Sequence, residues 1–402
     1  MSHKEKNFMK LRKRTSFILV VTSPLVGILI LVVNLCACGG GAAQGPILPP
    51  PSMQAAFVYT ANGGSDDVTA LKENLDTGSL SPVSGSPFHT DDINENVPGV
   101  ITVTPDGKFL YVGNANSAQI SAFSINGTTG LLTEVSGSPF PSGPSASVRV
   151  HPSGKFLYAA NFDQGSISVF GIDPATGVLS EILGSPFGLA GLVMSLALHT
   201  SGNFLYATYA GTDGLLGIAV FSVDPNTGVI TRLVHNRLDL QAGNLTMHPS
   251  GKFLYSARNN LFLMFSSVGG TAGIWTMSVD SVTGSLTLPS NQATPAVNPT
   301  EVAVDPSEKF AYASDDVQGT VGQFTIDGST GVLTRVADVG AGSQPFSLGT
   351  DAAGRFIYVA NAGSSDISVF AINASTGGLT ATSGSPFSAG TTPRALVTVS
   401  PR

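Results

Sequence analysis

An aromatic residue followed two positions later by tyrosine recurs seven times along this 402-residue chain. The pairs are Phe57/Tyr59, Phe109/Tyr111, Phe156/Tyr158, Phe204/Tyr206, Phe253/Tyr255, Phe310/Tyr312 and Phe356/Tyr358. Successive tyrosines are 52, 47, 48, 49, 57 and 46 residues apart. A period near this length is typical of the four-stranded blades of a β-propeller. The repeat therefore predicts a single all-β domain, a seven-bladed propeller, although the length alone would allow two or three domains.

Each repeat has the pattern of four short strands, which we name A to D. In the third repeat, strand A covers Val148–Val150, strand B Phe156–Ala160, strand C Ser166–Ile172 and strand D Val178–Ile182. Strand C alternates polar and apolar residues, as a half-buried strand does. An Asp/Asn-x-x-Thr-Gly turn precedes strand D in all seven repeats. Its glycine supplies a positive φ and its first side chain caps the turn. A calcium loop is the less favoured interpretation, because alternate oxygen ligands and a closing Glu are missing.

The two ends of the repeat region predict how the ring closes. The first repeat has no strand A, because Phe57 directly follows a Gly- and Pro-rich stretch. The chain ends in an unpaired apolar strand, Ala395–Pro401, which matches strand A of the second repeat, Val100–Pro105. We therefore expect the C-terminal strand to complete the first blade and to remove the open edges of the sheet. The propeller should cover residues 55–402.

The N-terminal segment has the pattern of an export signal. Six Lys and Arg residues precede an apolar run from Phe17 to Leu35, and Leu35-Cys36-Ala37-Cys38 follows. This ending resembles a bacterial lipobox, so we predict a signal peptide over residues 1–37, lipidation of Cys38 and a tether over 38–54. An uncleaved membrane-spanning anchor is the alternative. The expected location is the cell envelope, lipid-anchored in the outer membrane and periplasm or at the cell surface, with the membrane as a partner.

Composition narrows the classes of function. The only two cysteines, Cys36 and Cys38, lie in the export segment, so we expect no disulfide and no cysteine metal ligand in the folded domain. Without residues 1–37 the chain keeps 13 basic and 25 acidic residues. A domain this acidic, with no basic stripe, argues against a nucleic-acid partner. We expect a monomer without a cofactor.

The B–C and D–A loops should lie on one face of the propeller, where they vary in length and chemistry. The residue that ends strand B is Asn in four repeats, and these asparagines are expected to bond loop backbone. The remaining repeats have Tyr209, Arg258 and Asp315. A second column begins strand A near the central channel: Val100, Ser147, Ser195, Asn244, Glu301, Ser347 and, at the C-terminal strand, Leu396.

These columns predict a polar pocket at one side of the channel mouth. Arg258, Glu301 and Asp315 are the candidate catalytic residues, because an arginine can hold a carboxylate or oxyanion and an acid can transfer protons. Arg149, Tyr209, Asn244 and Arg394 are the candidate ligand-binding residues. The alternative is an ion pair of Arg258 with Glu301 or Asp315 that braces neighbouring blades. The longest insertion, with Leu261–Phe265, is either an exposed apolar patch or part of the core.

Three histidines, His151, His199 and His248, occupy the same position of the A–B turn in three repeats. Blade symmetry should hold them apart on the face of uniform turns. We therefore interpret them as turn residues and predict no metal site.

Repeats such as Phe356–Gly363, with Asp366–Phe370 and Ala374–Leu379, resemble the lactonase-type propellers. These include 6-phosphogluconolactonase-like proteins and surface-layer proteins with Tyr-Val-Thr-Asn repeats. The resemblance covers residues 55–402 and implies opening of a sugar or related lactone at the channel mouth. The resemblance also implies a site pattern: in the family enzymes an Arg-His pair opens a strand A, and an Asn-Glu pair ends a strand B. Here no repeat has that Arg-His pair. The residues after the matching asparagines are Gly63, Ala115, Phe162 and Ala362 instead of Glu, so no catalytic residue carries over by position.

Two hypotheses about function follow. In the first, the chain is an exported lactone hydrolase with a rearranged site, and its ligand is a small carbohydrate or lactone. In the second, it is a lipid-anchored propeller that binds a ligand or an envelope protein without catalysis.

Overall fold

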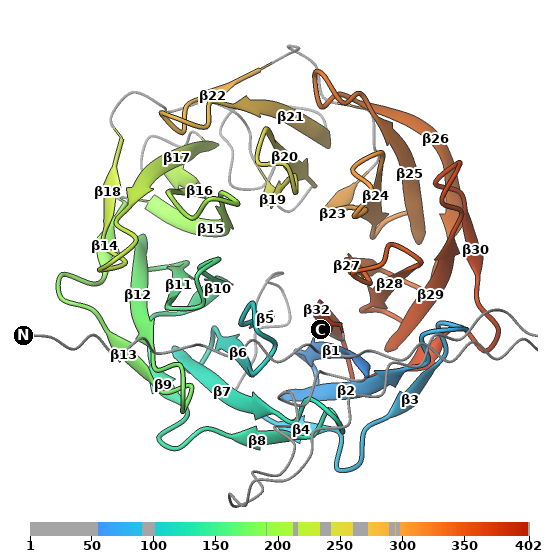
Figure 1. Cartoon of the computed structure of the whole chain (residues 1–402), viewed down its shortest axis with the longest axis horizontal. Helices are drawn as coiled ribbons and strands as arrows, with labels where there is room; N and C mark the ends of the chain where they lie inside the picture. Colours follow the sequence, from blue (N-terminus) through green and yellow to red (C-terminus); the bar gives the residue numbers. More distant parts are fainter. Residues whose placement is uncertain are drawn as a thin grey trace, which may run out of the picture. The chain divides into compact units, whose positions relative to one another are not determined.

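The computed structural model describes residues 55–90, 101–189, 191–211, 216–233, 243–259, 272–288, 294 and 298–400. These residues form seven antiparallel sheets in a ring around the axis of the predicted channel, as Figure 1 shows. The described residues contain no helix. The predicted signal peptide, Cys38, the tether and Leu261–Phe265 lie outside the described residues. Within the described part of the chain, no helix is long and apolar enough to cross a membrane.

Each sheet is one blade, with its strands in the order A-B-C-D from the channel outwards. Blade I consists of β32 (Pro393–Val399), β1 (Ala56–Asn62), β2 (Asp67–Glu73) and β3 (Leu80–Pro82). Blade II consists of β5 (Ile101–Val103), β6 (Phe109–Asn114), β7 (Gln119–Ile125) and β8 (Leu132–Glu134). Blade III consists of β10 (Ser145–Val150), β11 (Phe156–Asn161), β12 (Ser166–Ile172) and β13 (Leu179–Glu181). Blade IV consists of β15 (Gly191–Leu198), β16 (Phe204–Gly211), β17 (Leu216–Val223) and β18 (Ile230–Arg232).

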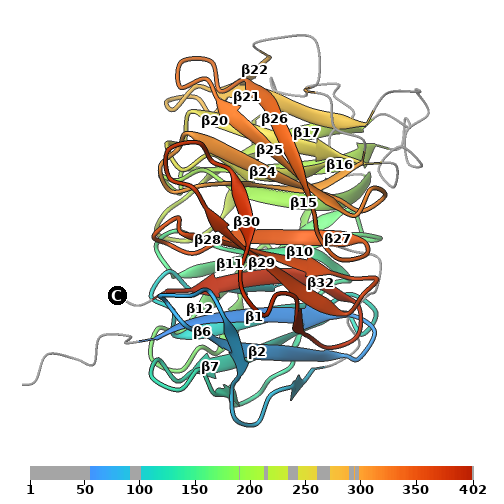
Figure 2. The same ribbon diagram turned by 90° about the vertical axis from the view of Figure 1, so that its right-hand side faces the viewer.

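The remaining blades follow the same plan, which Figure 2 shows from one side. Blade V consists of β19 (Asn244–Met247), β20 (Phe253–Arg258), β21 (Gly273–Val279) and β22 (Leu286–Thr287). Blade VI consists of β23 (Pro299–Val304), β24 (Phe310–Asp315), β25 (Thr320–Ile326) and β26 (Leu333–Gly340). Blade VII consists of β27 (Pro345–Thr350), β28 (Phe356–Asn361), β29 (Asp366–Ile372) and β30 (Leu379–Ala381). Two-residue strands β4 (Phe88–His89), β9 (Phe140–Pro141), β14 (Phe187–Gly188) and β31 (Phe387–Ser388) pair with strand C of blades I, II, III and VII.

The C-terminal strand closes the ring, as predicted. β32 pairs antiparallel with β1 and packs against β27 of blade VII, so the chain's two ends share one sheet. The register differs from the predicted one by a residue. Ala395 lies opposite Ala61, as Ser347 lies opposite Ala360 in blade VII, so Ala395 and not Leu396 belongs to the column at the start of strand A. Ser400, and not Pro401, occupies the position that Pro105 has in blade II. A match of the two prolines therefore shifts the expected register by one residue.

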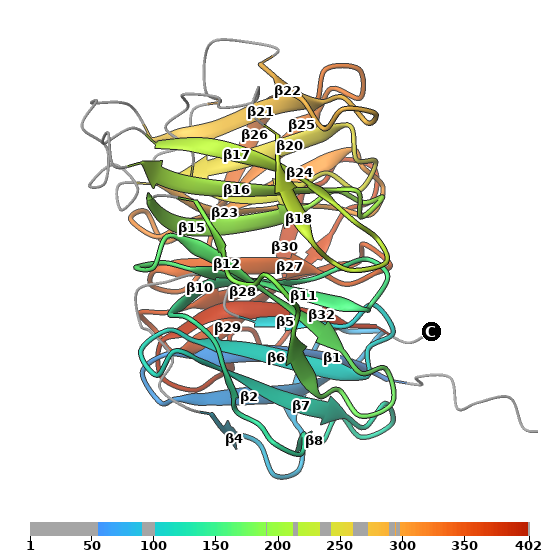
Figure 3. The same ribbon diagram turned by 90° about the vertical axis from the view of Figure 1, so that its left-hand side faces the viewer.

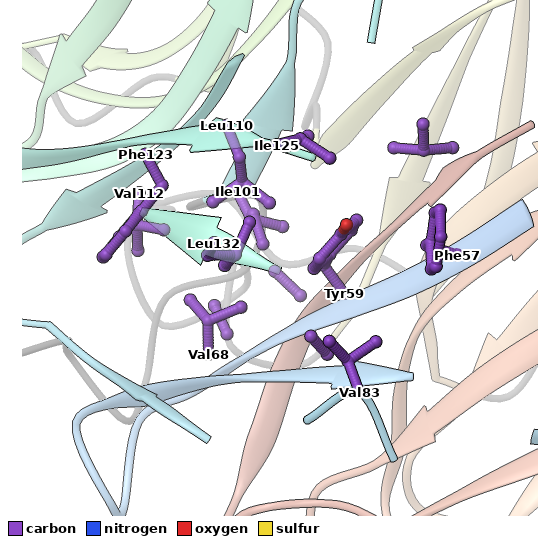
Figure 4. Packing of buried hydrophobic residues seen from close by; sticks show 14 of the residues in the cluster. Phe57, Tyr59, Val68, Val83, Ile101, Leu110, Val112, Phe123, Ile125 and Leu132 are labelled. Atoms are coloured by element: carbon purple, nitrogen blue, oxygen red, sulfur yellow. The ribbon is translucent and has the colours of Figure 1, made fainter. Parts of the chain in front are cut away.

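The hydrophobic core lies between neighbouring blades. Figure 4 shows one such interface, where Phe57, Tyr59 and Val68 of blade I pack with Leu110 and Phe123 of blade II. Burying a side chain of this size stabilises the fold by about 1.5–3 kcal/mol. Because every blade presents the same two apolar faces, the ring packs the same kind of contact seven times. The side view in Figure 3 shows the blades stacked face to face in this way.

The recurrent tyrosine of strand B explains the recurrent glycine of the C–D turn. Six of the seven tyrosine hydroxyls donate to the carbonyl of that glycine in the next blade, for example Tyr111 to Gly177 at 2.9 Å. We call this contact the tyrosine–glycine bridge. Gly177 has a φ of +76°, and a Cβ there would lie 2.4 Å from Phe109, so only glycine fits the turn.

The three A–B turn histidines join their turns to the next blade, which confirms that they are turn residues. The Ser153 N–H donates to Nδ1 of His151, so the ring carries its proton on Nε2, which donates to the Gly202 carbonyl at 2.9 Å. His199 bonds the Gly251 carbonyl in the same way at 3.0 Å. In blade VI, Glu308 occupies the corresponding turn position, and within the described residues Nε2 of His248 makes no hydrogen bond of standard geometry.

Candidate functional site

The residue that ends strand B marks the face of the B–C and D–A loops, here named the loop face. In blades I, II, III and VII it is asparagine, fully buried. Asn161 donates its side-chain amide to Ser166 at 3.0 Å and to Ser168 at 2.9 Å, both on strand C, and Asn361 bonds Asp366 and Ser368 likewise. These asparagines are therefore structural. The expectation that they bond loop backbone is wrong, because strand C supplies hydroxyl or carboxylate acceptors opposite them or two residues further along.

Blade V has Arg258 in this position and a different environment. The Arg258 side chain is 1% exposed and lies opposite Gly273, while Trp275 replaces the second hydroxyl residue of strand C. Within the described residues, the Nε and Nη2 atoms of Arg258 have no hydrogen-bond acceptor, and Nε1 of Trp275 has none either. Desolvation by burial lowers the pKa of Arg258 to about 10. Among the described residues, no ion pair joins Arg258 to Glu301 or Asp315.

The other two exceptions to asparagine make local contacts. Asp315 accepts backbone N–H groups from Asn298, Val317 and Gln318 at 2.9 to 3.2 Å, so its carboxylate caps the B–C turn of blade VI. Tyr209 is 3% exposed, and its hydroxyl accepts from Arg232 at 3.3 Å on the outermost strand of blade IV. The Arg232 guanidinium lies 5.4 Å from the centre of the Tyr209 ring.

The column at the start of strand A links the inner strands into a ring. Ser147, Ser195, Glu301 and Ser347 each accept a backbone N–H from the inner strand of the next blade, at 3.1 to 3.3 Å. Asn244 donates instead, to the Thr300 carbonyl at 2.7 Å. The column positions thus have a structural task, and Glu301 is the member that adds a charge.

Glu301 and Arg149 carry opposite charges on the inner strands of blades VI and III. Both side chains are half-buried, and both belong to the innermost strands of the ring. Desolvation raises the pKa of Glu301, while bonds to Ser347 and Leu348 and the charge of Arg149 act against this rise. Desolvation likewise lowers the pKa of Arg149, and Glu301 counteracts it. Arg149 also donates to the Val148 carbonyl at 2.8 Å.

A second cluster that contains charged residues lies at the loop face and is built from three blades. Arg394, which begins the inner strand of blade I, stacks on Phe346 of blade VII with its guanidinium carbon 4.3 Å from the ring centre. Asp316 of blade VI accepts a hydrogen bond from the Asn298 amide. Desolvation raises the pKa of Asp316, and the nearby charge of Arg394 lowers it. Arg394 is thus a predicted residue whose charge acts on Asp316, whereas Asp316 and Phe346 were not predicted.

Two cavities in the described residues lie away from these groups. One of about 380 Å³ opens on the loop face between blades III and IV and is lined by Asp163, Gln164, Gly165, Gly191, Leu192, Ala210 and Gly211. One of about 370 Å³ lies on the opposite face, among the A–B turns of blades I, II, VI and VII, with Thr104, Thr350, Asp351 and Ser400 in its wall. None of the predicted site residues lines either cavity. The departure of Phe162-Asp-Gln-Gly165 from the other B–C loops is the sequence signal for the first cavity.

The structure therefore distributes the predicted residues over several places. Glu301 and Arg149 influence one another at the channel, Arg394 belongs to the group with Asp316, and Asn244 joins two inner strands. Arg258 lies in blade V opposite Gly273. Tyr209 lies in blade IV, where its hydroxyl accepts a hydrogen bond from Arg232. Asp316 was missed because it follows the strand-end column by one residue.

Comparisons with known proteins agree with this architecture. The model of the family described as Lactonase, 7-bladed beta-propeller matches residues 52–144, 139–241, 236–348 and 286–397. No curated protein shows significant sequence similarity to the chain.

Solved structures with the same fold cover nearly the whole repeat region. A candidate 6-phosphogluconolactonase from Bacteroides fragilis is 22% identical, with 88% of this chain and 100% of that chain covered and a TM-score of 0.70. Its counterpart from Bacteroides uniformis is 20% identical, with 86% and 99% covered and a TM-score of 0.71. A periplasmic gluconolactonase from Pseudomonas aeruginosa is 18% identical, with 86% and 99% covered and a TM-score of 0.66. The chain belongs to the lactonase family of seven-bladed β-propellers.

Proposed function

We propose that this protein is an exported, lipid-anchored hydrolase that opens a lactone at the loop-face mouth of its channel. The observation that carries the proposal is Glu301, a channel-lining carboxyl group whose pKa is raised by desolvation and which is influenced by Arg149. A carboxylate of raised pKa is suited to take a proton from water, and a cation is suited to stabilise the oxyanion that forms.

In the proposed reaction Glu301 removes a proton from water as the water oxygen bonds to the lactone carbonyl carbon. Arg149 stabilises the negative charge on the carbonyl oxygen. The ring C–O bond then breaks, and the leaving alkoxide takes the proton back, so that one lactone and one water yield one hydroxy acid. Of the other predicted catalytic residues, Asp315 already accepts three backbone N–H groups, and we assign it to its turn.

The proposal is tested by hydrolysis of glucono-δ-lactone and related sugar lactones by the full-length protein. Glu301→Gln keeps the shape of the side chain and should lower kcat about 10²–10⁴-fold, the usual loss of a general base. Glu134→Gln, an exposed acid of blade II, is the matched control and should leave kcat unchanged. Arg258→Ala in the same assay tests the wider site predicted from the sequence. Full activity of Glu301→Gln would contradict the assignment.

Export and lipidation belong to the same proposal. They are supported by the lipobox-like sequence that ends at Cys38. The similar gluconolactonase of Pseudomonas aeruginosa is periplasmic. Inhibition of signal peptidase II should leave a precursor, and Cys38→Ala should abolish incorporation of labelled lipid. Normal maturation under inhibition would contradict a lipid anchor.

A second candidate function is that of a binding propeller without catalysis. It is favoured by the structural tasks of the column residues, since even Glu301 accepts a backbone N–H of the next blade. No turnover of any lactone by the folded wild-type protein, together with saturable binding of the same compounds, would favour this candidate over hydrolysis.

A further inference from the structure

Blade V departs from the other blades in the pair of strands that carries Arg258. In blade III, Asn161 lies opposite Ser166, and both Ser166 and Ser168 accept its amide. In blade V the corresponding strand C residues are Gly273 and Trp275. The asparagine and two hydroxyls are thus replaced by an arginine, a residue without a side chain and an indole.

The replacement leaves three buried donor atoms on one face of the blade. Cross-strand partners share a face of a sheet, and so do residues two apart along a strand, so Arg258 and Trp275 lie on the same face. Nε and Nη2 of Arg258 and Nε1 of Trp275 are buried, and no acceptor for them lies in the part of the chain that the structure describes. A buried polar group without a partner costs about 1–3 kcal/mol, and a charged group costs more. Such a set of donors is expected to have a ligand.

The main chain at Gly243 packs closely against the main chain at Arg258. The Gly243 N–H donates to Ser256 at 2.7 Å, and the Gly243 carbonyl accepts from Thr208 of blade IV at 2.8 Å. A Cβ on Gly243 would lie 1.8 Å from the Ala257 carbonyl oxygen and 2.8 Å from the Arg258 Cα. Two blades therefore hold a glycine against Arg258 where a side chain could not be accommodated.

The free edge of Arg258 is the edge that binds carboxylates side-on. The same chain has an example, in which Nε and Nη2 of Arg335 donate to the two oxygens of Asp338 at 3.0 and 2.6 Å. This planar pair of donors matches the two oxygens of a carboxylate. We propose that Arg258 and Trp275 form a binding site for a carboxylate-bearing small molecule at the loop-face edge of blade V. This inference is independent of the proposed hydrolysis.

The experiment uses the full-length protein and the fluorescence of Trp275, the only tryptophan of the chain. The probes are acetate, succinate and gluconate, with sorbitol as the uncharged counterpart of gluconate and inorganic phosphate as a tetrahedral anion. We expect at least one carboxylate to change the emission of Trp275 with saturation, and sorbitol to have no effect. Arg258→Gln should weaken that binding at least tenfold, whereas Arg335→Gln, the matched surface control, should not.

Several outcomes would overturn the proposal. These are no saturable response to any of the three carboxylates, an equal response of wild type and Arg258→Gln, or saturation by phosphate alone. If Arg258→Gln does not fold, Trp275→Phe replaces it, with thermal unfolding in the presence of the carboxylate as the readout. Glu301→Gln should still bind, so failure of the proposed hydrolysis and failure of this site are distinguishable.

Discussion

Tyr358 of blade VII and Glu73 of blade I face one another, both buried, and no hydrogen bond of standard geometry joins them. The other six strand B tyrosines form the tyrosine–glycine bridge. The Tyr358 hydroxyl makes no hydrogen bond of standard geometry within the described residues and faces Glu73 instead. Glu73 stands where blades II, III and VII have Ile125, Ile172 and Ile372 at the end of strand C. The exception therefore lies at the seam, the contact between the last and the first blade of the ring.

Replacing Glu73 by isoleucine should stabilise the protein at neutral pH. Desolvation raises the pKa of Glu73, so the charged form is the form that folding disfavours. Removing a buried charge whose desolvation outweighs the favourable influence of Tyr358 and Arg355, and restoring the residue of the other blades, should raise the free energy of unfolding by about 1–4 kcal/mol. The measurement is urea unfolding at pH 7.5. A lower midpoint for Glu73→Ile than for wild type would contradict this account of the seam.

The contribution of Glu73 to the free energy of unfolding depends on pH, and the raised pKa of Glu73 fixes the direction of that dependence. Because the pKa of Glu73 is higher in the folded state than its ordinary value of 4.5, the folded state binds the proton more tightly. This contribution to stability is fully present below pH 4.5 and is lost as the pH rises through the folded pKa. The difference in unfolding free energy between Glu73→Gln and wild type should therefore grow with pH. A difference that is constant from pH 4 to pH 8 would contradict the prediction.

Removal of a tyrosine hydroxyl should have different effects at the seam and elsewhere. Tyr312 donates to the Gly377 carbonyl at 2.9 Å, so Tyr312→Phe leaves a buried carbonyl without its donor and should cost about 1–3 kcal/mol. Tyr358→Phe removes a hydroxyl that forms no tyrosine–glycine bridge and no hydrogen bond of standard geometry, so it should cost much less than Tyr312→Phe. Thermal unfolding of the two variants side by side tests this, since the substitutions are chemically identical. Equal losses would contradict the tyrosine–glycine bridge.

The histidine of the A–B turn should make stability depend on pH in the opposite direction. Desolvation lowers the pKa of His151, and its neutral ring accepts the Ser153 N–H while donating to Gly202. The stability it contributes is present above the unfolded pKa of 6.5 and is lost as the pH falls through the folded value. His151→Thr, which uses the residue of blade II, should reduce the loss of stability between pH 7.5 and pH 5. An unchanged pH profile would exclude His151 as its source.

The repeat pattern alone predicted the seven blades, the strand order and the role of the turn histidines. It could not place the exceptions, because the side chain that lies opposite a residue depends on strand register. Leu396 was assigned one position too far along, since a match on prolines does not reveal register. Arg258 was expected beside Glu301, but its neighbours are set by the pairing of Gly273 and Trp275 with strand B. Asp315 looked like a free acid in sequence, and only the fold shows three backbone N–H groups on it.

Deleting residues 394–402 should abolish soluble folding. β32 supplies strand A of blade I and pairs with β1, so its loss exposes the inner edge of β1 and the apolar face of blade VII. Expression of the truncated chain should give aggregates, measured as the soluble fraction and by light scattering. A chain lacking only residues 401–402 is the control and should remain soluble. A soluble, cooperatively unfolding protein without residues 394–402 would contradict closure of the ring by this strand.

Replacing Arg258 by methionine should stabilise the ligand-free protein. The arginine is 1% exposed with Nε and Nη2 unpaired, and a methionine of similar length removes the desolvated charge while it fills the space. The expected gain is about 1–4 kcal/mol in the free energy of unfolding, measured in urea without added anions. Arg335→Met, which breaks an exposed ion pair with Asp338, should change stability by less than about 1 kcal/mol. A residue kept at a cost to stability is typical of a binding site, whereas destabilisation by Arg258→Met would mean that the arginine already has a partner within the fold.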